Sequence, residues 1–276
     1  MVARIDPSFP AELAPGISPE LARAILEAPV LREIHGNRRG VVVEVAVDGE
    51  HYARKHYRAR GLLRFRAITP ARRSWELLSR RQLPLPEAVC FTTDGPDAAV
   101  LVTRWFDGDH IHLAHAAAQD QLRDLISLDE FLRSIADSLV QLLKAGFATS
   151  DLAPQNVLVR RNATGWQAIL VDLDDVRLVD RISPAQVIEN LAQLGHLPPS
   201  ISSTTRLRFW RYFLAAGGES FLRGNRGKFE PRRPLEEITE RIDRLAREKS
   251  IRLKAKGLLE HRYSGWGLDA DGRPLR

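Results

Sequence analysis

Two carboxylates and one amide in the middle of the chain have a spacing that could support chemistry. Asp151 and Asn156 lie five positions apart in a short polar segment, and Asp172 follows the apolar run Ile169-Leu-Val171. Phosphoryl transfer from ATP needs a carboxylate to accept the proton of the attacking hydroxyl. It also needs an amide and a second carboxylate to hold magnesium against the phosphates. Asp151, Asn156 and Asp172 can fill these roles in that order.

A hairpin is predicted to bring these residues together. The runs Val157-Leu-Val159 and Ile169-Leu-Val171 are rich in β-branched residues, and a polar segment that contains Gly165 separates them. Asn156 precedes the first strand and Asp172 closes the second, so both side chains could reach one ion. Aspartate and asparagine are common in loops, where they bond to their own backbone, so the five-residue spacing alone is weak evidence. Together with the hairpin it is more specific.

The segment Ser150-Asp-Leu-Ala-Pro-Gln-Asn-Val-Leu-Val159, taken with Val171-Asp-Leu-Asp174, resembles the catalytic and metal-binding loops of the protein-kinase-like superfamily. The chain is most similar to the lipopolysaccharide kinases, the Kdo and heptose kinase family of Gram-negative bacteria, over roughly residues 30 to 215. It departs from the pattern at Thr149, where these kinases usually carry a histidine, and at Leu173-Asp174, which replaces Phe-Gly. Because that histidine mostly supports the loop, its loss bears on loop rigidity more than on chemistry.

Alternating runs near the start of the chain predict three antiparallel strands, Val30–His35, Val41–Val47 and Tyr52–Tyr57, with an Asp48-Gly49 turn. The resemblance implies that they form the floor of a nucleotide-binding lobe. It places Lys55 where kinases carry the lysine that contacts the α- and β-phosphates. Gly36 and Gly40 could bound a turn that covers the phosphates, although a plain hairpin turn is an open alternative because the three-glycine pattern is missing.

A helix is predicted over Thr69–Arg81, with Thr69 as N-cap and proline at its first position. Glu76 is its only acidic residue, and the resemblance implies that Glu76 pairs with Lys55. The alternative is that Glu76 pairs along the helix with Arg72, Arg73 or Arg80, which lie three or four residues away.

The apolar run Ala98–Arg104 predicts a buried strand, and Trp105 ends it. In a two-lobed kinase this break would be the hinge, where backbone groups of Arg104, Trp105 and Phe106 would hydrogen-bond the adenine edge.

Apolar residues at helical spacing predict a core helix over Leu125–Ala145 that Gly146 ends and that leads into the Asp151 loop. Further helices are predicted at 184–194, 206–216 and 235–256.

Composition limits the class of protein. With 276 residues, 44% of them hydrophobic, the chain can bury a substantial core without disulfides. Its single cysteine, Cys90, lies in an apolar run and is expected to be a buried thiol in a reducing compartment. We find no leader and no apolar run long enough to span a bilayer, so we expect a cytoplasmic protein. The 41 Lys+Arg exceed the 35 Asp+Glu and give a net charge of +6, which favours anionic partners.

These observations predict a two-lobed α+β protein of protein-kinase-like fold, with a small antiparallel-sheet N-lobe and a mainly helical C-lobe. We expect an N-terminal arm and short helix over 1–29, the N-lobe over 30–106 and the C-lobe over 107–276. The expected function is ATP- and Mg²⁺-dependent phosphorylation of a sugar hydroxyl in the lipopolysaccharide inner core. The alternatives are an aminoglycoside-type or protein kinase, which would share the same residues, and a non-catalytic pseudokinase scaffold.

The partner is expected to be a sugar or glycolipid acceptor, which is built on the inner face of the cytoplasmic membrane. The stretch Arg54–Arg66 interleaves cations with Leu62, Leu63 and Phe65, a composition suited to peripheral contact with an anionic membrane surface. The same stretch could be a plain loop between a strand and a helix. It could also bind nucleic acid, a partner that we do not favour.

Overall fold

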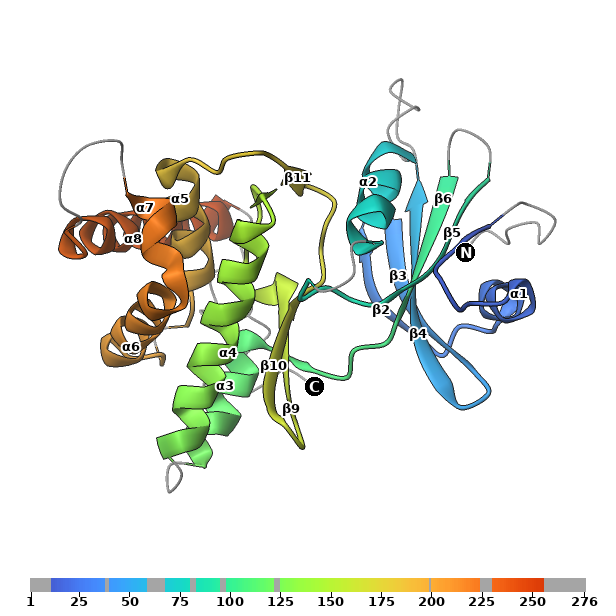
Figure 1. Ribbon diagram of the computed structural model, residues 1–276, viewed down its shortest axis with the longest axis horizontal. Helices are drawn as coiled ribbons and strands as arrows, with labels where there is room; N and C mark the ends of the chain where they lie inside the picture. Colours follow the sequence, from blue (N-terminus) through green and yellow to red (C-terminus); the bar gives the residue numbers. More distant parts are fainter. Residues whose placement is uncertain are drawn as a thin grey trace. The chain divides into compact units, whose positions relative to one another are not determined.

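The computed structural model describes residues 11–37, 40–58, 68–79, 83–94, 98–121, 125–198, 200–223 and 230–255. The chain divides into two compact units (Figure 1). The first contains the chain up to Asp107 together with the segment Asp172–Val176. The second contains Gly108–Val171 and the chain from Arg177 onward. One of the predicted site residues, Asp172, therefore belongs to the first unit although it follows the predicted hairpin in the sequence.

The first unit is built on a six-stranded antiparallel sheet in the order β1-β5-β6-β4-β3-β2. Its strands are Glu12–Leu13 (β1), Arg32–Asn37 (β2), Gly40–Val47 (β3), Glu50–Arg58 (β4), Ala88–Asp94 (β5) and Ala98–Arg104 (β6). The predicted strands near residues 30 to 57 and 98 to 104 are thereby confirmed. Asp48 and Gly49 both have positive φ, which matches the predicted tight turn between β3 and β4.

The two faces of this sheet are covered by different helices. The helix Pro19–Glu27 (α1) buries Ala22 and Ile25 in one core cluster with Val43, Val45 and other apolar residues of the sheet. The helix Ile68–Leu78 (α2) stacks its Trp75 on Phe91 of β5, with ring centroids 6.1 Å apart. Because neighbouring residues of a strand face opposite sides, β4 sends Tyr52, Arg54 and His56 to one face and Lys55 and Tyr57 to the other.

Arg54 ties α1 to the sheet. Its Nη1 atom donates to the carbonyl oxygens of Ile25, Leu26 and Ala28 at distances of 2.9, 2.7 and 3.1 Å. These carbonyls lie at the C-terminal end of α1, where backbone acceptors lack helical partners and a cation is favoured. Arg54 is 4% exposed, so this member of the basic stretch serves packing and presents no charge to a surface. Residues 59–67 of that stretch lie outside the described residues.

The second unit is mainly helical, as predicted. Its central helix Leu125–Lys144 (α4) buries one apolar face and packs on Ser203–Phe213 (α6) and on the hairpin of Val157–Asn162 (β9) and Gly165–Leu170 (β10). The predicted hairpin is confirmed, and Asp109–His110 (β7) adds a third strand beside β9. The remaining elements are Ile111–Asp120 (α3), Phe147–Ala148 (β8), Pro154–Asn156 (η2), Arg177–Leu178 (β11), Pro184–Gly195 (α5), Leu214–Gly218 (η3), Glu219–Leu222 (α7) and Arg232–Ala255 (α8).

Gly146 ends α4 and turns the chain toward the loop of Asp151. Its φ is 79°, and a Cβ atom at this position would lie 2.2 Å from the carbonyl oxygen of Val179. Only glycine satisfies both conditions. The chain then runs through β8, which pairs with β11, and enters the loop at Thr149.

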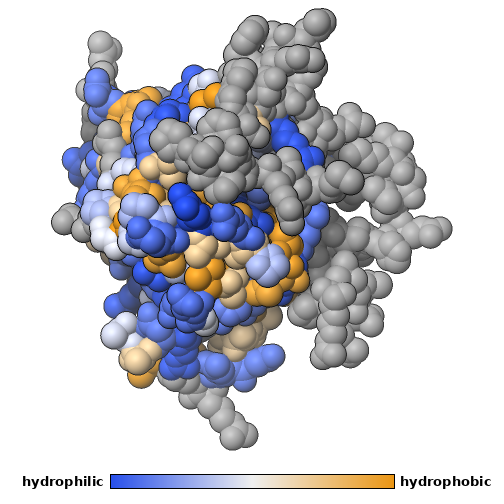
Figure 2. All heavy atoms as spheres, turned by 90° about the vertical axis from the view of Figure 1, so that its right-hand side faces the viewer, coloured by the Kyte–Doolittle hydropathy of each residue, from blue (hydrophilic) through white to orange (hydrophobic). Residues whose placement is uncertain are grey.

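One face of the molecule carries a group of apolar residues bordered by hydrophilic ones (Figure 2). Within the described part of the chain, every helix is too short or too polar to cross a bilayer.

Candidate active site

In the first unit, Lys55 lies in a cluster of polar groups. Its Nζ atom is 2.8 Å from Oδ1 of Asp174 and 3.1 Å from Oδ1 of Asp172. Tyr57, two residues along β4 on the same face, donates its hydroxyl to Oδ1 of Asp174 at 2.9 Å. Lys55 therefore lies on the same face of the sheet as Tyr57 and contacts the segment that carries the predicted metal-binding carboxylate, Asp172.

The surroundings of Lys55 keep it charged. Its burial alone would lower the pKa, but Tyr57, Asp174 and Asp172 around the ammonium group outweigh this effect and raise the pKa above its ordinary value. Burial has the opposite effect on an acidic group, and it raises the pKa of the Tyr57 hydroxyl above its usual range. At neutral pH the cluster therefore holds a lysine cation and a neutral tyrosine, which suits the binding of phosphate by Lys55 and a donor role for Tyr57.

The predicted pairing of Lys55 with Glu76 is wrong. The buried face of α2 consists of Ala71, Ser74, Trp75, Leu77 and Leu78, and Glu76 lies on the opposite, exposed face. Glu76 makes no ion pair within the described part of the chain, and its neighbour Arg72 bonds to Glu12 instead. The helix is present, but its rotation about its own axis turns the glutamate away from the sheet.

Asp174 takes the place that was expected for Glu76. Sequence reasoning missed both Asp174 and Tyr57 as site residues. Asp174 was noted only as a departure from the Phe-Gly pattern. The available signal was its acidic side chain, because a second carboxylate close to Asp172 can pair with the lysine in place of a helix glutamate. Tyr57 could have been found from alternation along β4, which places it on the face of Lys55.

Gly36 and Gly40 lie in the paired strands β2 and β3. β2 and β3 pair through Asn37 and Gly40, and residues 38 and 39 lie outside the described residues. A Cβ atom on Gly40 would lie 2.1 Å from the carbonyl oxygen of His56 on β4. Close approach of two strands therefore explains this glycine without any phosphate, and the role of Gly36 and Gly40 in nucleotide binding stays a prediction.

The expected hinge residues use part of their backbone within the sheet. The amide of Arg104 donates to the carbonyl of Glu87 at 2.9 Å, and the amide of Trp105 donates to the carbonyl of His51 at 3.0 Å. These two N–H groups are therefore not available to adenine. Contact with adenine by Arg104, Trp105 and Phe106 stays a prediction, which now rests on their carbonyl groups and on the amides that follow Trp105.

In the second unit, the loop of Asp151 and Asn156 is held by its own hydrogen bonds. The amide of Asp151 donates to Oγ1 of Thr149 at 3.1 Å, and Nδ2 of Asn156 donates to the carbonyl of Asp151 at 3.1 Å. Asn156 is 8% exposed, whereas Asp151 is exposed. The backbone of Asp151 is thus bonded on both sides, and the residue itself is exposed, as access of an acceptor hydroxyl requires.

The oxygen donors of the predicted metal ligands fit magnesium. Because Nδ2 of Asn156 bonds to Asp151, Oδ1 is oriented as an acceptor, and no described group donates to it. The carboxylate of Asp172 is 43% exposed and retains an oxygen that Lys55 does not contact. Amide and carboxylate oxygens are the ligands that Mg²⁺ prefers. Within the second unit, the amide of Val171 donates to the carbonyl of Asn156 at 2.9 Å, so the backbone of Asn156 is held by the end of the hairpin.

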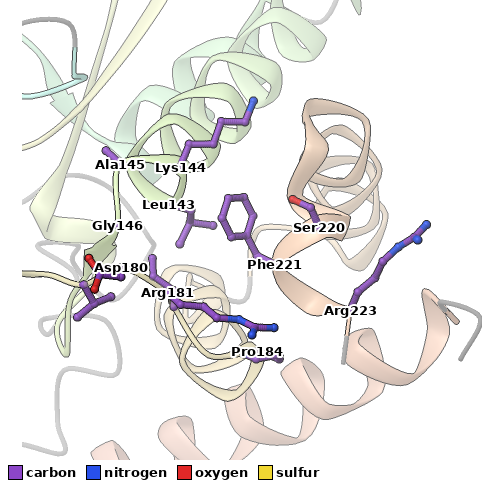
Figure 3. Close-up of a pocket in the computed structure, with 12 residues that line it drawn as sticks. Leu143, Lys144, Ala145, Gly146, Asp180, Arg181, Pro184, Ser220, Phe221 and Arg223 are labelled. Atoms are coloured by element: carbon purple, nitrogen blue, oxygen red, sulfur yellow. The ribbon is translucent and has the colours of Figure 1, made fainter. Parts of the chain in front are cut away.

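The second unit contains a cavity of about 470 Å³. It is bordered by the end of α4, the segment before α5, and α7 (Figure 3). Phe221 and Leu143 point toward one another at its centre, whereas the side chains of Lys144 and Arg223 extend away from it. Its lining includes neither Asp151 nor Asn156, and its cations do not converge, so we assign no chemistry to it.

Cys90 has no part in the chemistry. Its thiol is completely buried in β5, and burial raises its pKa to about 12. The prediction of a buried, unreactive cysteine is confirmed, because a thiol in this state does not form the thiolate that nucleophilic or metal-binding chemistry needs.

A sheet unit with a lysine–carboxylate cluster, followed by a mainly helical unit with an aspartate and an asparagine on one loop, defines a phosphotransferase of protein-kinase-like fold. A model of the lipopolysaccharide kinase (Kdo/WaaP) family matches residues 24–213. The chain belongs to this family. The predicted resemblance and fold class are thereby confirmed.

A solved structure supports the fold independently. The structure described as "WaaP in complex with acyl carrier protein" matches with a TM-score of 0.57 and 14% sequence identity, covering 87% of this chain and 97% of that chain. At this identity the likeness concerns the fold. No curated protein matches the chain.

Proposed function

We propose that this chain is an ATP- and magnesium-dependent kinase that phosphorylates a sugar hydroxyl of the lipopolysaccharide inner core. The observation that carries the proposal is the family match over residues 24–213, which spans every polar residue of the candidate site. A lipopolysaccharide kinase family implies ATP as the phosphoryl donor and a sugar or glycolipid as the acceptor. The oxygen donors of Asn156 and Asp172 support magnesium, and the acceptor in the inner core is inferred from the family alone.

Each residue has a proposed role. When bound, ATP with Mg²⁺ supplies the phosphoryl group and neutralises part of its charge. Lys55 binds the phosphates as a permanent cation, and Asp174 and Tyr57 hold Lys55 in place. Asn156 and Asp172 provide the oxygen ligands for the metal. Asp151 accepts the proton of the acceptor hydroxyl.

The test is transfer of labelled phosphate from ATP to purified lipopolysaccharide from which hydrofluoric acid has removed the core phosphates. Wild type should label this acceptor when Mg²⁺ is present. Asp151→Asn should lose at least about a hundredfold in transfer, because removal of a positioned base typically costs 10²–10⁴-fold. ATP should still raise its melting temperature, since Asp151 does not hold the nucleotide. Asp172→Ala should instead lose the Mg²⁺-dependent part of the thermal shift.

The outcomes separate the proposal from its alternatives. Near wild-type transfer by Asp151→Asn would show that the loop has been assigned wrongly. A thermal shift with ATP but no transfer to lipopolysaccharide, sugars or protein would favour a pseudokinase scaffold. Transfer to an aminoglycoside or a protein, but not to the dephosphorylated lipopolysaccharide, would retain the chemistry and change the acceptor.

We also infer that the protein approaches an anionic membrane surface to reach its acceptor. The support is chemical, because a lipopolysaccharide precursor is anchored in a membrane and the chain has a net charge of +6. Of the basic stretch, Arg54 and Lys55 are engaged inside the first unit. The inference therefore rests on Arg60, Arg64 and Arg66, which lie outside the described residues.

A further inference from the structure

Three amide side chains of α5 bond to the backbone of the loop that carries Asp151. Nε2 of Gln186 and Nδ2 of Asn190 both donate to the carbonyl oxygen of Thr149, at 3.1 and 2.8 Å. The third amide, that of Gln193, bonds to Ser150 and Leu152, one and three residues further along the loop. The spacing of four and then three residues places all three on one stripe of the helix.

Gln193 bonds to the loop on both sides of Asp151. Its Nε2 donates to the carbonyl of Ser150 at 2.8 Å, and its Oε1 accepts the amide of Leu152 at 2.9 Å. One side-chain amide thus closes a ring around the residue between them. Reorientation of either peptide plane next to Asp151 would break one of these bonds, so Gln193 restrains the backbone from which the Asp151 carboxylate projects.

Asn190 is the buried anchor of this set. It is 2% exposed, and its only side-chain partner among the described residues is the carbonyl of Thr149. Asparagine has no advantage in a helix interior, and burial of an amide is unfavourable unless its hydrogen bonds are made. The residue is therefore explained by the bond to the loop and by no property of α5 itself.

We propose that Asn190 and Gln193, assisted by Gln186, are positioning residues for Asp151. They support the loop at Thr149, the place where similar kinases carry a histidine, so the amides of α5 supply the rigidity that this departure removes. This inference rests on the proposed function, because it assigns Asp151 the role of proton acceptor. None of the three amides touches the reacting atoms in this proposal.

A displaced base should slow transfer and leave nucleotide binding unchanged. Small misplacements of a catalytic group can cost about a hundredfold in rate. We expect Asn190→Leu and Gln193→Leu to lower kcat by about 10- to 100-fold, with the KM for ATP changed by less than about threefold. Gln193→Glu keeps the acceptor for the Leu152 amide and loses the donor to Ser150, so its kcat should lie between those of wild type and Gln193→Leu.

The control separates positioning from general stability. Ile188 is a buried residue of α5, two positions before Asn190 and on a different side of the helix. Ile188→Ala should lower the melting temperature at least as much as Gln193→Leu does. It should nevertheless keep kcat within about twofold of wild type, because it leaves the bonds to the loop in place.

The experiment measures transfer from ATP to the dephosphorylated lipopolysaccharide and, in parallel, hydrogen exchange of residues 149–156 in the same full-length proteins. Faster exchange in this segment with a lower kcat for Asn190→Leu and Gln193→Leu, and neither effect for Ile188→Ala, supports the proposal. Unchanged exchange overturns it, and so does faster exchange with an unchanged kcat. Should wild type transfer no phosphate, the proposed function fails, and a normal exchange rate in the variants would show separately that the amides do not hold the loop.

Discussion

The partner of Lys55 is the residue on which sequence and structure differ most. The sequence offered one acidic residue on the right helix, whereas the structure places Asp174 and Asp172 against the ammonium group. The buried neighbours of Glu76 along α2 could not reveal this, because Glu76 directly follows the buried Trp75, and adjacent residues of a helix point about 100° apart. The choice between two acidic partners depends on how α2 is rotated, and that is set by Trp75 packing on Phe91.

We therefore predict energetic coupling between Lys55 and Asp174 and none between Lys55 and Glu76. In double-mutant cycles on the transfer rate, Lys55→Met with Asp174→Asn should show a coupling of about 1–3 kcal/mol, since residues in contact are non-additive. The matched cycle with Glu76→Gln should be additive within about 0.5 kcal/mol. Coupling of equal size in both cycles would restore Glu76 as a partner of Lys55.

A second residue-scale prediction concerns pH. His56 lies on the α1 face of β4, 7% exposed, and burial together with Arg54 and Arg58 lowers its pKa to about 4. An unfolded histidine titrates near about 6.5. As pH falls from about 6.5 to about 4, the unfolded chain takes up the proton first, so the folded state loses stability, and the loss is complete below about 4.

His56→Leu should remove this dependence. Urea unfolding at several pH values between 7 and 4 should show that the free energy of unfolding of the variant falls less than that of wild type, by about 1–3 kcal/mol at the acid end. His115, whose pKa burial also lowers to about 4, remains in the variant and supplies a residual slope. Parallel curves for the two proteins would contradict the assignment of His56 as a buried neutral histidine.

At the scale of elements, the sequence predicted most of the fold. Strands β2 to β4, β6, the β9–β10 hairpin and helices α1, α4 and α5 were expected from alternation, helical spacing and caps. The short helix expected within residues 1–29 is α1, and the Oγ of its N-cap Ser18 accepts the amide of Leu21 at 3.2 Å. Such local signals depend on neighbours in the chain, which is why they were readable. The helix predicted to begin after Thr69 instead begins at Ile68, within the usual uncertainty of helix ends.

Contacts between distant elements could not be read from the sequence. The bonds from α5 to the Asp151 loop join residues about forty positions apart, and those from Arg54 to α1 join residues almost thirty apart. A glutamine or an arginine has the same local propensity whether or not it meets such a partner. The amide stripe on α5 was visible only as polar residues on an amphipathic helix, where solvent exposure is the ordinary explanation.

Arg54 provides a test at this scale. Arg54→Leu removes the donor to three buried or partly buried carbonyls at the end of α1, so the free energy of unfolding should fall by about 2–4 kcal/mol. Arg23→Leu, which removes an exposed cation from α1 itself, should change it by less than about 0.5 kcal/mol. Hydrogen exchange in α1 should accelerate for the first variant only. A similar small effect of both changes would mean that α1 stays on the sheet without Arg54.

At the scale of the whole molecule, the division into two units constrains how the chain can be dissected. The segment Asp172–Val176 belongs to the first unit, although the chain on both sides of it belongs to the second. A fragment that ends at Asp107 would therefore lack both carboxylates that contact Lys55. For this reason each of the experiments above uses the full chain.

The last prediction concerns the net charge of +6 and the acceptor. A kinase acting on a membrane-anchored glycolipid gains from weak attraction to anionic lipids, about 1 kcal/mol for each cation near the surface, and salt weakens it. Arg60, Arg64 and Arg66 alternate with Leu62, Leu63 and Phe65, so cations and apolar side chains could act together. A plain connecting loop with the same composition would show no such preference.

Co-sedimentation with vesicles distinguishes these two interpretations. Wild type should partition to anionic vesicles more than to neutral ones at low salt, and less at high salt. A variant with Arg60, Arg64 and Arg66 changed to Gln should lose most of this preference while retaining transfer to a soluble, deacylated acceptor. Arg232, Arg233 and Arg244 on α8 provide a control with the same loss of charge. If both triple variants weaken partitioning equally, net charge alone explains the attraction, and the basic stretch has no specific role at the membrane.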